Sequence, residues 1–262
     1  MQRVHLVPAA WAAGGVAALV ALDIAIPISP AGWVAGVGYL LVSTVLLSVG
    51  LARRGARRLG AANATTATRS TLVGLVTALV ATAFTQPVPP LLLVAIVVPA
   101  LALDAVDGWL ARRTHGETPL GARFDMEVDA FLLLVLSVDV ARALGGWVLA
   151  IGLLRYAFVA AGWALPWMQV TLPPRYWRKV VTAVCGIALT LATTQLAPPP
   201  VAAAAVGIAL ALLVESFGRD VVWLARMRMR SQPSAERVAQ GAARTRVVQD
   251  GAIGDPKATG AS

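Results

Sequence analysis

Long apolar runs divide most of this chain and restrict the folds open to it. Of its 262 residues 58% are hydrophobic and 13% charged, whereas a soluble domain carries about 25% charged residues. A helix needs about 20 apolar residues to cross a bilayer, and only helices and closed barrels satisfy their backbone groups there. We therefore predict an all-α, polytopic membrane helical bundle. The predicted spans cover approximately residues 8–26, 31–51, 70–85, 91–112, 121–144, 146–163, 178–196 and 201–223.

The first two runs follow each other almost directly and predict an N-terminal transmembrane hairpin, residues 1–52. Because Arg3 precedes the first run, a signal peptide is the alternative. The basic stretch from Arg53 to Arg58 is too short to span a membrane, and we expect it to lie on anionic headgroups.

Residues 53–230 form the main predicted membrane domain. After Arg230 the chain is polar and poor in large apolar residues, so we predict a disordered cytoplasmic tail over residues 231–262. The single cysteine, Cys185, excludes an internal disulfide and a cysteine-based metal cluster.

Four aspartates lie at the facing ends of two neighbouring predicted helices. With about 100° per residue, a helix places Asp104 and Asp107 within one sector of its surface. On the next helix, Asp125 and Asp129 are four residues apart and lie along one face. Carboxylates crowded at a membrane need cations to stay ionised, and their hard oxygens suit Mg²⁺ or Mn²⁺.

The spacing of this segment is D-x2-D-G-x2-A-R-x8-G-x3-D-x3-D, complete from Asp104 to Asp129. It resembles the signature of the CDP-alcohol phosphotransferase family. The resemblance implies a six-helix core, here with two extra N-terminal transmembrane helices. It further implies an enzyme that transfers a substituted phosphate from a CDP-linked donor to an alcohol hydroxyl and releases CMP. Two Mg²⁺ or Mn²⁺ ions and a homodimer are also implied.

The resemblance assigns roles to the matching residues. Asp129 is expected to take the proton from the acceptor hydroxyl, and the Arg112 guanidinium to meet phosphate. The expected metal ligands are Asp104, Asp107, Asp125 and Asp129. The expected CDP pocket contains Gly108, Ala111, Arg112 and Gly121.

A second pattern, N-x2-T-x2-R, lies just before the third predicted span at Asn63, Thr66 and Arg69. It resembles the start of the core in many members of the same family, near the nucleotide end of the active site. Ala62 stands where these members usually have proline. We therefore add Asn63 and Thr66 to the expected CDP pocket, although Asn and Thr are also ordinary helix-start residues.

The sequence is less informative about the acceptor. Arg155 lies inside an apolar run, where a charge is a functional hypothesis by default. It is expected either to hold an acceptor phosphate or to pair with Asp139 on the neighbouring predicted helix. Glu127 and Ala130, beside the last aspartates, depart from the family members that use known acceptors. His115 is expected to be a solvated loop residue.

The arginines and lysines set the predicted orientation. With the aspartates on the cytoplasmic side, 20 of the 22 basic residues fall on inner segments, and only Arg142 and Arg155 lie elsewhere. This distribution obeys the positive-inside rule. It places the protein in the cell (inner) membrane with a cytoplasmic active site. It also explains the net charge of +9 without a nucleic-acid partner.

We therefore predict a phosphotransferase for other substituted phosphate groups, with CDP-diacylglycerol as donor, in phospholipid biosynthesis. A soluble CDP-alcohol donor, such as CDP-inositol or CDP-choline, is the alternative within the class. From other classes, a divalent-cation transporter and a scaffold without catalysis stay open.

Overall fold

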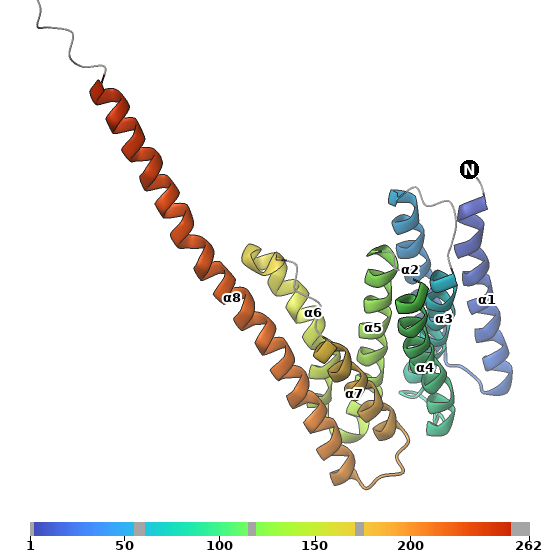
Figure 1. The fold of residues 1–262 in the computed structure, drawn as a ribbon. Coiled ribbons are helices and arrows are strands. Elements are labelled where there is room, and N and C mark those ends of the chain that lie inside the picture. Colours follow the sequence, from blue (N-terminus) through green and yellow to red (C-terminus); the bar gives the residue numbers. More distant parts are fainter. Residues whose placement is uncertain (1–2, 55–60, 115–118, 171–175, 253–262) are drawn as a thin grey trace, which may run out of the picture. The chain divides into compact units, whose positions relative to one another are not determined.

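The computed structural model of the chain describes residues 3–54, 61–114, 119–170 and 176–252, and the regular elements in these ranges are all helices (Figure 1). The predicted all-α class is confirmed. The helices are α1 (Arg3–Ala25), α2 (Pro30–Arg54), α3 (Ala61–Thr82), α4 (Pro90–Thr114), α5 (Pro119–Leu144), η1 (Gly146–Val148), α6 (Leu149–Ala164), η2 (Pro166–Gln169), α7 (Tyr176–Thr193) and α8 (Pro199–Ala252).

Length and composition identify three membrane-spanning candidates in the described part of the chain. They cover Pro30–Val49 in α2, Gly146–Ala164 in η1 and α6, and Pro199–Met229 in α8. Shorter apolar stretches of 10–17 residues lie in α1, α3 and α4. The length and composition of these helices are those expected of a membrane protein. The number of eight transmembrane spans remains a prediction.

The last helix differs from the sequence-based expectation. We predicted a disordered tail from Ser231, but α8 continues to Ala252. The segment from Ser231 to Ala252 is rich in alanine, arginine and glutamine, which are strong helix formers and prolong a helix that has already begun. Residues 253–262 lie outside the described part of the chain.

The chain divides into two compact units. The first consists of Met1–Phe158 and Arg175–Val214 and contains α1 to α5, α7 and the beginnings of α6 and α8. The second consists of Val159–Pro174 and Glu215–Ser262. Within the second unit, the Arg228 guanidinium lies 5.8 Å from the centre of the Trp167 ring. The candidate functional residues described below belong to the first unit.

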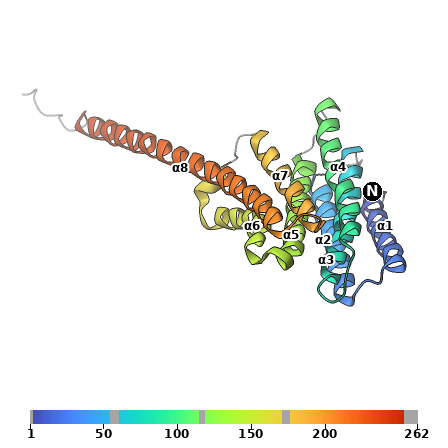
Figure 2. The same cartoon turned by 90° about the horizontal axis from the view of Figure 1, so that it is seen from below.

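Helix α3 is the central element of the first unit. It contacts α1, α2, α4 and α5, and these helices lie side by side in both views (Figures 1 and 2). Val73, Val76 and Leu79 of α3 are fully buried. Because consecutive helices run in alternating directions, α3 begins, α4 ends and α5 begins at the same end of this unit. That end carries the polar motifs.

The N-terminal hairpin packs tightly on α3 through small residues. A Cβ atom on Gly32 would meet the Thr82 hydroxyl and would lie 2.7 Å from the Ala78 carbonyl oxygen. A Cβ atom on Gly74 would lie 2.9 Å from a methyl group of Leu40. The Thr82 hydroxyl also accepts a hydrogen bond of 3.2 Å from the Ser29 backbone N–H. These contacts require glycine, and they fix α2 against α3.

Replacement of Gly32 by valine is expected to destabilise the protein, because the new side chain has no space against α3. Overpacking of this kind costs about 1–3 kcal/mol, which corresponds to a loss of at least about 3 °C in unfolding temperature. Gly38→Val is the matched control on the same helix, since a Cβ there meets nothing within 4 Å. Thermal unfolding in detergent, followed by tryptophan fluorescence, measures the difference. Equal unfolding temperatures for the two variants would contradict the packing described here.

Candidate metal centre

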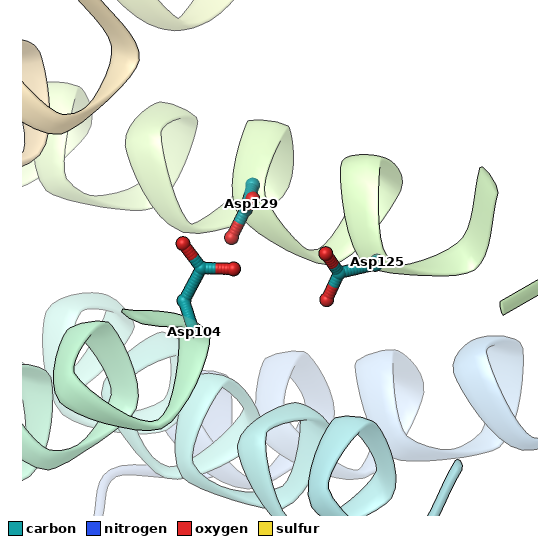
Figure 3. Close-up of side chains that lie close together, drawn as sticks. All are labelled: Asp104, Asp125 and Asp129. Carbon is teal, nitrogen blue, oxygen red and sulfur yellow. The ribbon is translucent and has the colours of Figure 1, made fainter. Parts of the chain in front are cut away.

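Three of the four predicted aspartates converge in the structure. Asp104 projects from α4 towards Asp125 and Asp129 on α5 (Figure 3). One carboxylate oxygen from each residue lies within 4.8 Å of the other two. The side chains are 43%, 31% and 25% exposed in that order, so the cluster is accessible from outside. The sequence-based expectation that the two helices direct carboxylates into one space agrees with this geometry.

A buried arginine lies among these carboxylates. The Arg69 side chain is fully buried, and its Nη1 atom lies 2.6 Å from Oδ1 of Asp104. Its Nη2 atom lies 2.7 Å from Oδ1 of Asp125 and 2.8 Å from Oδ1 of Asp129. The same nitrogen donates a hydrogen bond of 3.1 Å to the backbone carbonyl of Asp125. One guanidinium therefore joins α3 to α4 and α5.

The electrostatic role of Arg69 follows from these distances. Two like unit charges at a separation of about 5 Å repel each other by about 3 kcal/mol when the effective dielectric constant is about 20. Three carboxylates and one guanidinium leave a formal charge of −2 at the cluster. Arg69 reduces the repulsion without removing the negative potential, and the cluster therefore still attracts cations.

From the sequence, Arg69 was assigned only to the N-x2-T-x2-R pattern and to the basic residues on the cytoplasmic side. Its contacts with the aspartates were not predicted. One sequence signal pointed to this role. Between Thr65 and Thr85, Arg69 is the one charged residue, and the other residues are apolar or carry a hydroxyl group. An arginine inside such a run requires an anionic partner.

The cluster fits a divalent cation of the hard class. Its ligand atoms are carboxylate oxygens, which Mg²⁺ and Mn²⁺ prefer. Each aspartate carries two such oxygens, and the ion pairs that Asp104 and Asp129 form with Arg69 involve the Oδ1 atoms. The donor set is therefore compatible with the predicted metal site.

Several predicted site residues have side chains outside the described part of the structure. They are one metal ligand, Asp107, and the expected CDP-pocket residues Asn63, Thr66, Gly108, Ala111, Arg112 and Gly121. Their roles stay predictions. His115 also lies outside the described residues.

Arg155 has a different partner from the one considered in the sequence analysis. It forms an ion pair with Glu127, while Asp139 pairs with Arg142 at 3.0 Å. The expected alternative, a pair between Arg155 and Asp139, is therefore wrong. Asp139 lies 12 residues after Glu127 on α5, about 18 Å along the helix axis, beyond the reach of one arginine. Helix α6 crosses α5 where Gly152 meets the backbone of Leu134, and this crossing brings Arg155 to Glu127.

Comparison with protein families identifies one match. The family model described as CDP-alcohol phosphatidyltransferase matches residues 59–215. This range includes α3, α4 and α5 and all the aspartates of the cluster. It begins after α2, so the N-terminal hairpin lies outside it. Comparison with curated proteins and with solved structures gives no match.

Replacement of Arg69 by glutamine is expected to destabilise the metal-free protein, because three carboxylates then lose their common counter-ion. Removal of one partner from a buried ion pair costs about 3–5 kcal/mol, equivalent to about 6 °C or more in unfolding temperature. Added Mn²⁺ should restore more stability to this variant than to the parent protein. Arg219→Gln is the control, since Arg219 is 61% exposed and pairs with Glu215, itself 45% exposed, four residues earlier on its own helix. Thermal unfolding in EDTA and in Mn²⁺ tests this expectation, and an unaltered Arg69→Gln variant in EDTA would refute it.

Proposed function

The chain belongs to the CDP-alcohol phosphatidyltransferase family, and from this premise we propose that it transfers a phosphatidyl group from CDP-diacylglycerol to an alcohol hydroxyl, with release of CMP. The observation that supports this most strongly is the convergence of Asp104, Asp125 and Asp129 around a buried guanidinium. A nucleotide pyrophosphate is itself anionic, so it approaches such carboxylates only with cations between them.

The aspartates have two proposed roles. Asp104, Asp107 and Asp125 would hold two Mg²⁺ or Mn²⁺ ions. When bound, these ions neutralise charge on the pyrophosphate and orient the displacement. Asp129 contributes to the same ligand set and accepts the proton of the acceptor hydroxyl. Gly108, Ala111, Arg112, Gly121, Asn63 and Thr66 line the proposed CDP pocket.

Arg69 acts on the carboxylates rather than on the substrate. It is fully buried and contacts all three described aspartates. Its planar guanidinium presents nitrogen atoms in fixed directions. We propose that it fixes the orientation of the carboxylates. The carboxylate oxygens that do not contact Arg69 would then face the metal ions and the bound donor.

A lipid donor is compatible with the apolar surface of the helices. The helix α2 exposes large apolar side chains, among them Leu41, Val42 and Val45, as expected for a helix in contact with the acyl chains of a bilayer, where a lipid-linked donor would also lie. An inner-membrane location with a cytoplasmic active site and a homodimeric assembly complete the proposal. A soluble CDP-alcohol donor stays the alternative within the same chemistry.

The acceptor proposal rests on the Arg155–Glu127 ion pair. Glu127 lies between Asp125 and Asp129 in sequence and is 51% exposed. Because Glu127 neutralises Arg155, the guanidinium is not available as a free phosphate-binding group. We therefore propose an acceptor alcohol that carries no phosphate.

Acceptor-dependent release of CMP is the primary test. The purified protein is given CDP-diacylglycerol, Mg²⁺ or Mn²⁺, and single acceptors: glycerol 3-phosphate, inositol, inositol phosphate or serine. One acceptor should support CMP release, and EDTA should abolish it. Asp129→Asn should lower the rate by at least about 100-fold, the usual contribution of a general base. Glu215→Gln, which breaks an exposed pair with Arg219, should retain full activity. The proposal fails if no acceptor supports CMP release and CDP with Mn²⁺ does not stabilise the protein.

Replacement of Glu127 by glutamine tests the acceptor proposal. The change frees Arg155 and should shift the ratio of kcat/KM values towards phosphate-bearing acceptors by about tenfold, since the pair is partly exposed and therefore screened. Glu127→Asp keeps the charge and serves as the control. The same acceptor preference in Glu127→Gln and in the parent protein would exclude this role for the pair.

A further inference from the structure

A tyrosine of the N-terminal hairpin contacts two of the helices that meet at the aspartate cluster. The hydroxyl oxygen of Tyr39, on α2, accepts a hydrogen bond of 3.3 Å from the Ser70 hydroxyl on α3. The Tyr39 ring also stacks on the Phe131 ring of α5, with 4.6 Å between the ring centres and 21° between the ring planes. A single side chain of α2 therefore joins α3 to α5.

These contacts lie beside the charged residues of the cluster. Ser70 directly follows Arg69, and Phe131 lies two residues after Asp129, which belongs to the group drawn in Figure 3. The Tyr39 hydroxyl is itself close enough to Arg69 and to Asp129 to interact with both electrostatically. Tyr39 is therefore next to the cluster in space as well as through its two partners.

The Tyr39 ring has a fixed place between the helices. A Cβ atom on Gly74 of α3 would lie 3.4 Å from the Cδ1 atom of this ring and 2.9 Å from a methyl group of Leu40. The absence of a side chain at Gly74 thus lets the ring pack against the backbone of α3. Because interiors are close-packed, a ring held in this way transmits the position of one helix to the next.

Arg69 needs such support from its helix. Its Nε atom is buried and makes no hydrogen bond with the described residues, while its Nη1 and Nη2 atoms contact Asp104, Asp125 and Asp129. The guanidinium is therefore hydrogen-bonded at its far end alone. Its orientation depends on where the backbone of α3 lies relative to α4 and α5, since a buried ion pair is favourable only in good geometry.

We propose that Tyr39 is a positioning residue of the candidate metal centre, which holds α3 and α5 at the separation at which Arg69 meets Asp125 and Asp129. It acts through these residues rather than on a metal ion or a substrate. The inference rests on the proposed function, because it takes the aspartates to be the ligands of the divalent ions. Tyr39 precedes residue 59, where the family match begins, so the hairpin supplies this part of the centre.

Replacement of Tyr39 by alanine tests this role. The affinity for Mn²⁺ should fall by about tenfold, because the variant loses both an aromatic pair and a hydrogen bond that hold the carboxylates in place. Electron paramagnetic resonance of free Mn²⁺ in detergent solution, without nucleotide or acceptor, measures this affinity. Asp125→Asn should also weaken binding, which identifies the aspartate cluster as the site that is measured.

Leu19→Ala is the matched control for a loss of packing in the hairpin. Leu19 is fully buried, and a Cβ atom on Gly36 of α2 would lie 3.3 Å from one of its methyl groups. Truncation of a buried leucine destabilises a protein, so this variant should unfold at a lower temperature in EDTA and still bind Mn²⁺ like the parent protein. Equal Mn²⁺ affinities in Leu19→Ala and Tyr39→Ala, whether reduced or not, would overturn the proposal.

The hydrogen bond can be tested apart from the ring. Tyr39→Phe and Ser70→Ala each remove this bond and keep the rest of the packing, so each should weaken Mn²⁺ binding by about threefold. The double variant should bind like either single variant, because both changes remove the same interaction. Full additivity of the two effects would show that the hydroxyl groups act separately, which contradicts the proposed role.

These measurements separate the inference from the transfer reaction. If the parent protein releases CMP but binds Mn²⁺ no better than Tyr39→Ala does, the role of Tyr39 is wrong and the proposed function stands. If no acceptor supports CMP release but Tyr39→Ala selectively weakens Mn²⁺ binding, the role of Tyr39 stands and the transfer reaction is wrong. A parent protein that binds no Mn²⁺ would refute the role of Tyr39, whatever the CMP assay shows.

Discussion

The structure of the candidate site depends on one buried cation. Arg69 contacts Asp104 on α4 and both Asp125 and Asp129 on α5, so a single side chain on α3 determines how three helices meet. Without a positive charge at this point, the carboxylates would repel one another and the helix ends would separate. The same contacts explain why α3 carries a charged residue near its start. Burial of the Arg69 guanidinium beside the apolar core would be unfavourable without these carboxylates.

The position of Arg69 depends in turn on the packing of α3. Val73, Val76 and Leu79 hold the helix in the core, and Gly32 allows α2 to approach it closely. Since a buried arginine tolerates little displacement from its partners, this packing contributes to the site as well as to stability. The N-terminal hairpin therefore belongs to the same structural unit as the metal centre, although the family match begins only at residue 59.

The Arg155–Glu127 pair shows why part of the site could not be predicted. Both residues attracted attention in the sequence, Arg155 as a charge inside an apolar run and Glu127 as an unusual neighbour of the aspartates. Their pairing depends on where α6 crosses α5, and Gly152 against Leu134 sets that crossing. Sequence spacing gives the faces of single helices, but it does not give the height at which two helices meet, and it therefore left Asp139 as an equally reasonable partner.

The sequence by itself determined the helical class and the approximate boundaries of the helices up to α7, but not the end of α8, because apolar runs between proline, glycine and arginine-rich breaks leave few alternatives in a bilayer. It also determined that the aspartates lie on facing helix ends, since their spacing matches the helical repeat, and the motif identified the family. The tertiary structure alone placed Arg69 among Asp104, Asp125 and Asp129 and paired Arg155 with Glu127. These features depend on contacts between helices distant in sequence, and such contacts arise only when the whole first unit has packed.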